Sequence, residues 1–148
     1  MKRILVVDDD IEVLETIQLI LEIGGFKVSA LNNGEEVFDR IESFNPDLIL
    51  LDISLGHIDG RVLCEQLKSI ESTSKIPILL ISGLYDPKDF TTLNYGQDDF
   101  LSKPFQMDVL LKKITKILSL EQDESYLMNW FESPETGTTP NLLTLSNP

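Results

Sequence analysis

Three short runs of aliphatic residues, each ended by a polar side chain, constrain this chain more than any other feature. The runs and the polar residues that follow them are 4–7 before Asp8, 48–51 before Asp52 and 78–81 before Ser82. An unbroken aliphatic run with no polar alternation predicts a strand that is buried on both faces, as in a parallel sheet. Each polar residue therefore lies at the carboxyl end of a buried strand, where α/β sheets bind their ligands.

The segments between these runs change from strand patterns to helical periodicity. Apolar residues recur at helical spacing over 11–21, 37–44, 61–70 and 109–118, and more weakly over 87–94, while 26–31 and 99–102 read as two further strands. Strands that alternate with helices predict an α/β fold, a five-stranded parallel sheet with helices on both faces. In the flavodoxin-like order 2-1-3-4-5 the first and third strands are neighbours, so Asp8, Asp9 and Asp52 converge.

Converging carboxylates repel one another, and a divalent cation is the usual relief. Their oxygen atoms, with no cysteine or clustered histidine nearby, favour Mg²⁺ over Ca²⁺. Ser82 and Lys103 follow the fourth and fifth strands and reach the same edge, where a hydroxyl and an ammonium group suit a phosphoryl group. The set of side chains is typical of phosphoryl transfer.

The composition limits the partners and the compartment. The 25 acidic and 12 basic residues give a net charge of −13, which disfavours direct binding to nucleic acid or anionic lipid. One cysteine permits no internal disulfide, and no apolar run approaches the roughly 20 residues of a membrane span. The first residues lack the apolar core of a signal peptide. We therefore expect a cytoplasmic protein with no membrane insertion.

The composition shifts near residue 121. We expect one domain over 1–120 and an acidic tail over 121–148, which carries five acidic residues and no lysine or arginine. Residues 134–148 lack helical periodicity, and we expect them to be disordered. Residues 126–131 are mostly apolar, which favours a helical extension packed on the domain over a docking segment for a partner.

The polar residues at the strand ends together carry a family resemblance. The set comprises Asp8 and Asp9, Asp52 with Gly60 eight residues later, Ser82, and Lys103-Pro104-Phe105. In order, spacing and context, residues 3–118 resemble the receiver domain of response regulators in two-component signalling. No single motif is specific, but the ensemble is.

The resemblance implies a role for each of these residues. Asp52 would accept a phosphoryl group from a phosphohistidine on a histidine kinase or a phosphotransfer protein. Asp9 and Asp52 would ligate Mg²⁺ with the backbone carbonyl of Ser54, and Asp8 would help through water. Lys103 would pair with the acyl phosphate.

The resemblance also implies a switch. Ser82 would bond the acyl phosphate and move toward it, and Phe100 stands where the family often has an aromatic side chain whose rotamer follows phosphorylation. A phosphorylation-linked homodimer is a further expectation that the sequence leaves open.

Three features depart from the family pattern. Gly56 replaces the usual proline, which we expect to loosen the loop after Asp52. The run 95–97 carries larger side chains than usual beside the last strand, and the spacing from Ser82 to Lys103 is about one residue short. None of these departures removes a candidate ligand.

Two other functions compete with a stand-alone receiver that signals through protein contacts. A haloacid-dehalogenase-type phosphatase would use Asp8 and Asp10 with an acidic pair such as Asp98-Asp99, but it leaves Asp52 unexplained. A pseudo-receiver would keep the fold and act only as a binding module.

Several other residues invite simpler interpretations. We expect Asp10 to cap a helix, and Asp98 and Asp99 to end a turn before the last strand. His57 is expected to be solvated and without a catalytic role, and Cys64 to be an inert, semi-buried thiol.

Overall fold

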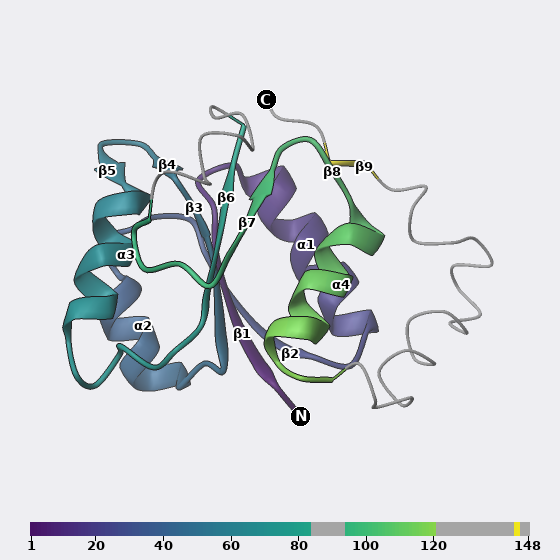
Figure 1. The fold of residues 1–148 in the computed structure, drawn as a ribbon. Helices are drawn as coiled ribbons and strands as arrows, with labels where there is room; N and C mark the ends of the chain where they lie inside the picture. Colours follow the sequence, from purple (N-terminus) through teal and green to yellow (C-terminus); the bar gives the residue numbers. More distant parts are fainter. Residues whose placement is uncertain (84–93, 121–143, 146–148) are drawn as a thin grey trace.

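Five parallel strands form the centre of the molecule (Figure 1). The computed structural model describes residues 1–83 and 94–120 and the short strand β9, Thr144–Leu145. The sheet has the order β2-β1-β3-β6-β7, which confirms the predicted flavodoxin-like topology. The strands are β1 Arg3–Val7, β2 Lys27–Leu31, β3 Leu48–Asp52, β6 Ile78–Ser82 and β7 Asp99–Ser102.

Four described helices cover the two faces of this sheet (Figure 1). Helices α1, Ile11–Ile23, and α4, Met107–Ile117, pack on one face, and α2, Val37–Phe44, and α3, Gly60–Ser69, on the other. The weak helix predicted over 87–94 lies outside the described residues, apart from Asn94, which is not helical. Among the described helices, none combines the length and the hydrophobicity that a bilayer crossing requires.

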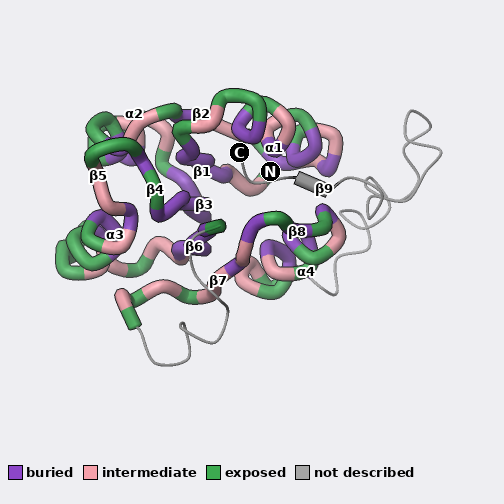
Figure 2. The backbone as a smooth tube through the Cα atoms, turned by 90° about the horizontal axis from the view of Figure 1, so that it is seen from above, coloured by how far each residue is buried: buried purple, intermediate pink, exposed green. Residues whose placement is uncertain are grey.

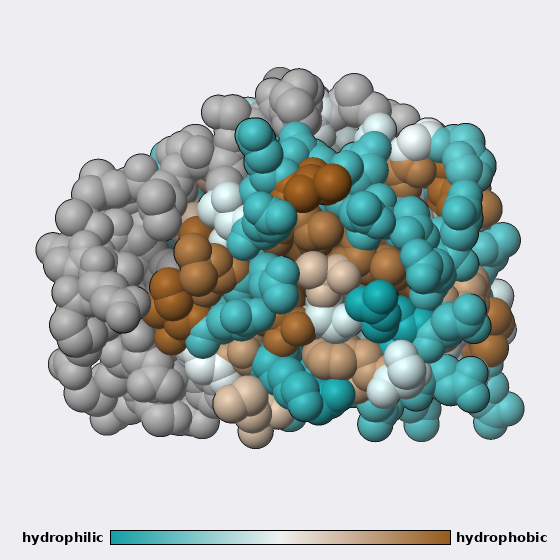
Figure 3. All heavy atoms as spheres, turned by 180° about the vertical axis from the view of Figure 1, so that it is seen from behind, coloured by the Kyte–Doolittle hydropathy of each residue, from teal (hydrophilic) through white to brown (hydrophobic). Residues whose placement is uncertain are grey.

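Alternate residues of the central strands supply a core to each face. In β1, Ile4 and Val6 join the cluster under α1 and α4, while Leu5 and Val7 join the cluster under α2 and α3. The strands are therefore buried on both sides, as the unbroken aliphatic runs predict. Figure 2 shows this burial along the central strands, with exposed residues on the outer helices, and Figure 3 shows hydrophobic areas separated by polar side chains.

The register of the strands aligns their carboxyl ends. Val7 pairs with Leu51, so Asp8 and Asp52 continue two neighbouring strands from the same level. Asp52 pairs in turn with Ile81, which places Ser82 one position further on β6. The sheet thus delivers the polar residues to one edge.

The loop after Asp52 forms a hairpin, which the sequence analysis did not anticipate. Strand β4, Ser54–Leu55, pairs antiparallel with β5, Ile58–Asp59, and Leu55 is buried. Gly56 lies in the two-residue turn with φ +67°, a conformation that proline cannot adopt. The turn therefore favours glycine and excludes proline at this position.

Gly60 begins α3 at a point of close backbone contact. A Cβ atom here would collide with the carbonyl oxygen of Asp52 and lie 2.8 Å from the Cα of Ile53. The Gly60 amide donates to the Ile53 carbonyl at 2.7 Å, and the Asp59 side chain caps the helix through the Arg61 amide at 2.9 Å. The start of α3 therefore packs directly against the backbone of the site.

Replacing Gly60 tests this close contact. We expect Gly60→Ala to lower the free energy of unfolding by about 3 kcal/mol, because backbone atoms must move to admit the methyl group. Gly56→Ala is the matched control, since its Cβ would meet open space and only the positive φ costs about 1 kcal/mol. Urea unfolding of both variants measures the difference, and equal losses would contradict the steric argument.

Candidate functional site

Three carboxylates from separate parts of the chain meet at the carboxyl edge of the sheet. Asp8 and Asp9 follow β1 and Asp52 ends β3, and one oxygen of each lies within 4.8 Å of the other two. Asp8 and Asp52 are 2% and 5% exposed, whereas Asp9 is exposed to solvent. The cluster thus has two buried members and one that faces solvent.

Lys103 links the two buried carboxylates. Its Nζ donates to Asp8 Oδ2 at 2.8 Å and to Asp52 Oδ2 at 3.2 Å, and its side chain is 3% exposed. The lysine follows β7, and its amide donates to the carbonyl of Ser82 at 2.8 Å. The peptide bond from Lys103 to Pro104 is cis. One ammonium group therefore lies between residues that are far apart in the sequence.

Backbone amides hold the other oxygen of each buried carboxylate. The Asp10 amide donates to Asp8 Oδ1 at 2.9 Å, and the Ser54 amide donates to Asp52 Oδ1 at 3.2 Å. Both carboxylates are thus oriented by one amide two residues later and by the shared Lys103. These amides were not predicted from the sequence, although a turn directly after each aspartate is a signal that could have suggested them.

Two buried carboxylates share a single ammonium group, so negative charge exceeds positive charge when both are ionised. Burial, followed by the charge of Asp8, raises the pKa of Asp52 from 3.8 to about 7, despite the opposing effects of Lys103 and the Ser54 amide. Burial alone would lower the pKa of Lys103, but its hydrogen bond to Asp8 and the charges of both aspartates outweigh this and raise it. An additional cation would therefore stabilise the ionised form of Asp52.

Ser82 and Phe100 lie on the two strands beyond β3. Ser82 is fully buried at the end of β6, in register with Ser102 of β7. Phe100 pairs with Leu80 and packs, partly buried, against the core on the side of α2 and α3. The structure therefore places Ser82 at the carboxyl edge of the sheet and Phe100 nearer the middle of β7.

The acidic pair that a phosphatase would need lies at the opposite edge of the sheet. Asp98 and Asp99 stand at the start of β7, not at its carboxyl end. Asp98 Oδ2 accepts from the Ile78 amide at 2.8 Å and from Lys68 Nζ at 3.0 Å. The structure therefore does not assemble the phosphatase constellation, and Asp98 ties β7 to β6 and α3.

Three other residues have structural surroundings of their own. Asp10 caps α1, as predicted, by accepting from the amides of Glu12 and Val13. His57 is exposed, as predicted, but lies 2.8 Å from Glu35. Cys64 is fully buried rather than semi-buried, and burial raises the pKa of its thiol to about 11. None of the three side chains joins the carboxylate cluster.

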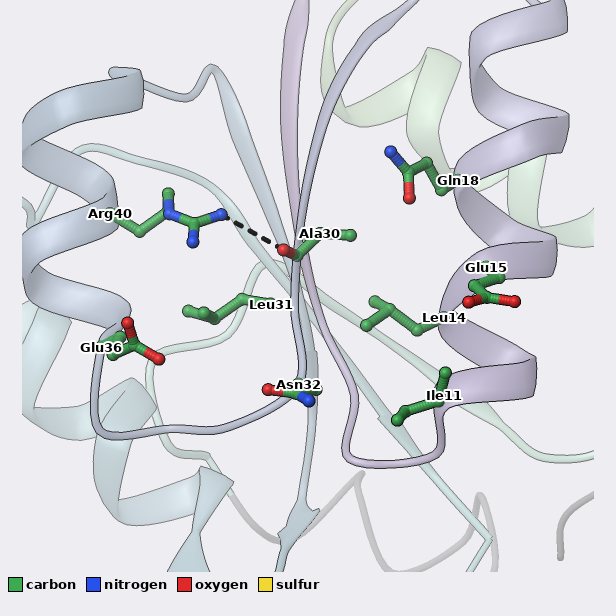
Figure 4. Close-up of a pocket in the computed structure, with 9 residues that line it drawn as sticks. All are labelled: Ile11, Leu14, Glu15, Gln18, Ala30, Leu31, Asn32, Glu36 and Arg40. Carbon is green, nitrogen blue, oxygen red and sulfur yellow. Dashed lines mark hydrogen bonds between the residues drawn. The ribbon is translucent and has the colours of Figure 1, made fainter.

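A pocket of about 350 Å³ lies elsewhere, at the outer edge of β2 between α1 and α2 (Figure 4). Arg40 crosses this edge from α2, where its Nη1 donates to Ser29 Oγ at 2.7 Å and to the Ala30 carbonyl at 3.2 Å. The arginine thus occupies part of the backbone edge of an outer strand, which hinders pairing with another chain. This pocket contains none of the carboxylates of the site.

Comparisons with known proteins agree with this geometry. The family model described as "Response regulator receiver domain" matches residues 4–115. The DNA-binding dual master transcriptional regulator RpaA of Synechocystis sp. (strain ATCC 27184 / PCC 6803 / Kazusa) is 33% identical over 80% of this chain and 49% of its own. The response regulator protein GraR of Staphylococcus aureus (strain Newman) is 30% identical over 86% of this chain and 58% of its own. The chain spans about half the length of these curated relatives.

A solved structure extends the likeness to the fold. The crystal structure of a putative response regulator from Chloroflexus aurantiacus J-10-fl matches with a TM-score of 0.73 and 32% identity, covering 80% of this chain and 98% of that one. The family model matches well over half of the chain, and the sheet order is the one predicted from the alternation of strands and helices. The chain belongs to the family of response regulator receiver domains of two-component systems.

Proposed function

We propose that Asp52 accepts a phosphoryl group from a phosphohistidine on a partner histidine kinase or phosphotransfer protein, and that the domain then signals through protein contacts. The observation that carries the proposal is the buried Asp52 carboxylate, which shares Lys103 with Asp8 beside the exposed Asp9. An anionic nucleophile, a fixed ammonium group and further carboxylates are what phosphoryl transfer requires.

The donor set fits a hard divalent cation. Three carboxylate oxygens lie within 4.8 Å of one another, and oxygen ligands suit Mg²⁺. Asp9 and Asp52 would hold the ion directly with the backbone carbonyl of Ser54, and Asp8 would contribute through water. When bound, Mg²⁺ would offset the negative charge on the oxygens of the transferring phosphoryl group.

In the proposed transfer, Asp52, Lys103 and the Ser54 amide each have a different role. An oxygen of the Asp52 carboxylate attacks phosphorus, the bond from phosphorus to the donor imidazole nitrogen breaks, and that nitrogen keeps the electron pair and takes up a proton. Lys103 Nζ, already 3.2 Å from Asp52, hydrogen-bonds the incoming phosphoryl oxygens. The amide of Ser54 holds the carboxylate in place during the attack.

The phosphoryl group also changes the local charge and so favours a second packing arrangement. Ser82, fully buried next to the site, would move its hydroxyl toward the phosphoryl oxygens, and Phe100 would change rotamer with it. The net charge of −13 favours protein partners over nucleic acid as the output, although the relative RpaA is DNA-binding by name. A homodimer formed on phosphorylation is compatible with this proposal, as is a cytoplasmic location.

Incubation with acetyl phosphate and Mg²⁺ tests the phosphoacceptor. We expect one phosphoryl group per chain, stable in acid and labile in base, and its loss in Asp52→Asn because the amide is a poor nucleophile. Intact-protein mass spectrometry measures the incorporation. Asp39→Asn, which removes an exposed carboxylate of α2, is the matched control and should label like the wild type.

The competing functions give different results in the same experiment. A phosphatase would hydrolyse generic phosphoesters, and it would lose this activity in Asp8→Asn while keeping it in Asp52→Asn. A pseudo-receiver would fail to label with any donor in the presence of Mg²⁺. Either outcome would overturn the proposed phosphoacceptor role.

The raised pKa of Asp52 predicts a pH dependence of the metal-free protein. Because the folded pKa is about 7 and the unfolded value 3.8, ionisation of Asp52 reduces stability progressively as the pH rises from about 4 to about 7. Asp52→Asn removes this cost, so it should raise Tm by several degrees at pH 8 in EDTA and have little effect at pH 4. Calorimetry at both pH values measures this difference, and a lower Tm for the variant at pH 8 would contradict the prediction.

A further inference from the structure

Besides the five-stranded sheet and the hairpin of β4 and β5, the structure contains a pairing of two short strands close to the site. Strand β8, Phe105–Gln106, follows Pro104 and pairs antiparallel with β9, at the upper right of the sheet in Figure 1. Phe105 is in register with Leu145, and Gln106 with Thr144. Because Lys103 stands two residues before Phe105, this pairing joins a distant part of the chain to the segment that carries the ammonium group of the site.

The backbone of β8 is held in a fixed position. Phe105 is 4% exposed and Met107 is fully buried, and both side chains belong to the core under α1 and α4. Gln106 between them is exposed and extended, with φ −83° and ψ 143°, and its side chain makes no cap hydrogen bond to α4. The backbone of β8 is therefore already extended, and a strand can pair with it without a change in its conformation.

The charge of the pairing segment suits its place near the carboxylates. All five acidic residues of 121–148 fall within 121–135, and residues 136–148 contain no charged side chain. A neutral segment can approach Asp8, Asp9 and Asp52 without the repulsion that an acidic one would meet. The neutral part of the chain is the part that contains β9.

We propose that β8 is a strand-addition surface whose occupant is this chain's own Thr144–Leu145. The occupied edge admits an extended segment of another protein only after Thr144–Leu145 has left it. Resting on the proposed phosphoacceptor function, the pairing would regulate the access of protein partners on the Lys103 side of the site.

Because β8 and β9 belong to the same chain, Thr144–Leu145 is favoured over a segment of a separate molecule as the partner of β8. Thr144–Leu145 and β8 are separated by 37 residues of one chain, so their pairing is intramolecular, with an effective concentration on the order of 1 mM. Because the segment of the same chain is always present at this effective concentration, a free peptide competes with it only at comparable concentrations. We therefore expect Thr144–Leu145 to occupy β8 in the absence of a competing segment, and a competing extended segment to replace it at such concentrations.

Hydrogen exchange of the backbone amides tests the pairing in the full chain. In an antiparallel ladder one of the two pairs exchanges both N–H···O bonds. Replacing both residues, Thr144→Pro with Leu145→Pro, removes the β9 donor of that pair and so weakens the pairing in which a β9 carbonyl accepts from the β8 amide. We expect the amide of Phe105 or Gln106 to exchange at least about tenfold faster in this variant. Thr138→Pro with Thr139→Pro, outside the paired residues, is the control and should leave the rate unchanged.

A peptide added in trans tests the surface itself. The synthetic peptide of residues 140–148, at about 1 mM, should restore slow exchange in the Thr144→Pro, Leu145→Pro variant and bind the wild type far more weakly. Unchanged exchange in that variant, or equal peptide binding to both proteins, would overturn the proposal. Protection that disappears on dilution would assign the occupant to a second copy and overturn it too.

Two features keep this test separate from the others. Slow exchange of the amides in β1 and β3 verifies that the doubly substituted protein is folded. The measurement uses no phosphate donor, so its failure would leave the role of Asp52 untouched, and a failure of Asp52 to label would leave the strand-addition surface intact.

Discussion

The contact of Lys103 with both Asp8 and Asp52 is the interaction on which the site depends. It brings together the ends of β1, β3 and β7, because the lysine reaches across the edge of the sheet to residues 95 and 51 positions away. The contact only partly offsets the cost of burying two carboxylates, and the pKa of Asp52 stays raised at about 7. A site that remains short of positive charge is well suited to bind a cation and then a phosphoryl group.

The fold supports this contact through rigid surroundings. The central strands are buried on both faces, which holds the backbone that leads to Asp8 and Asp52 in place. Because Val7 pairs with Leu51, the two aspartates lie side by side at the carboxyl ends of their strands. Gly60 lets α3 begin against the Asp52 carbonyl, so the helix and the hairpin before it confine the backbone after Asp52. Apolar packing therefore sets the backbone positions of Asp8 and Asp52, whereas Lys103 and two backbone amides orient their carboxylates.

Exposed strand edges are handled in two different ways in this chain. Arg40 lies across the outer edge of β2 and bonds the Ala30 carbonyl, while β9 pairs with β8 next to the site. The arginine side chain and the paired strand both form hydrogen bonds with backbone groups that could otherwise pair with another chain. The pairing of β9 with β8 stands two residues from Lys103, so under our proposal its loss would change access to that side of the carboxylate site.

The sequence alone determined the strands, their order and the residues at their carboxyl ends, because unbroken aliphatic runs followed by Asp8, Asp52 and Ser82 leave few ways to pack a parallel sheet. Three features follow from the tertiary structure and not from the sequence pattern: the contact of Lys103 with two aspartates, the hairpin after Asp52 and the pairing of β8 with β9. These features depend on distances between segments remote in the chain and on the backbone conformation of single residues. Local periodicity carries no information about either.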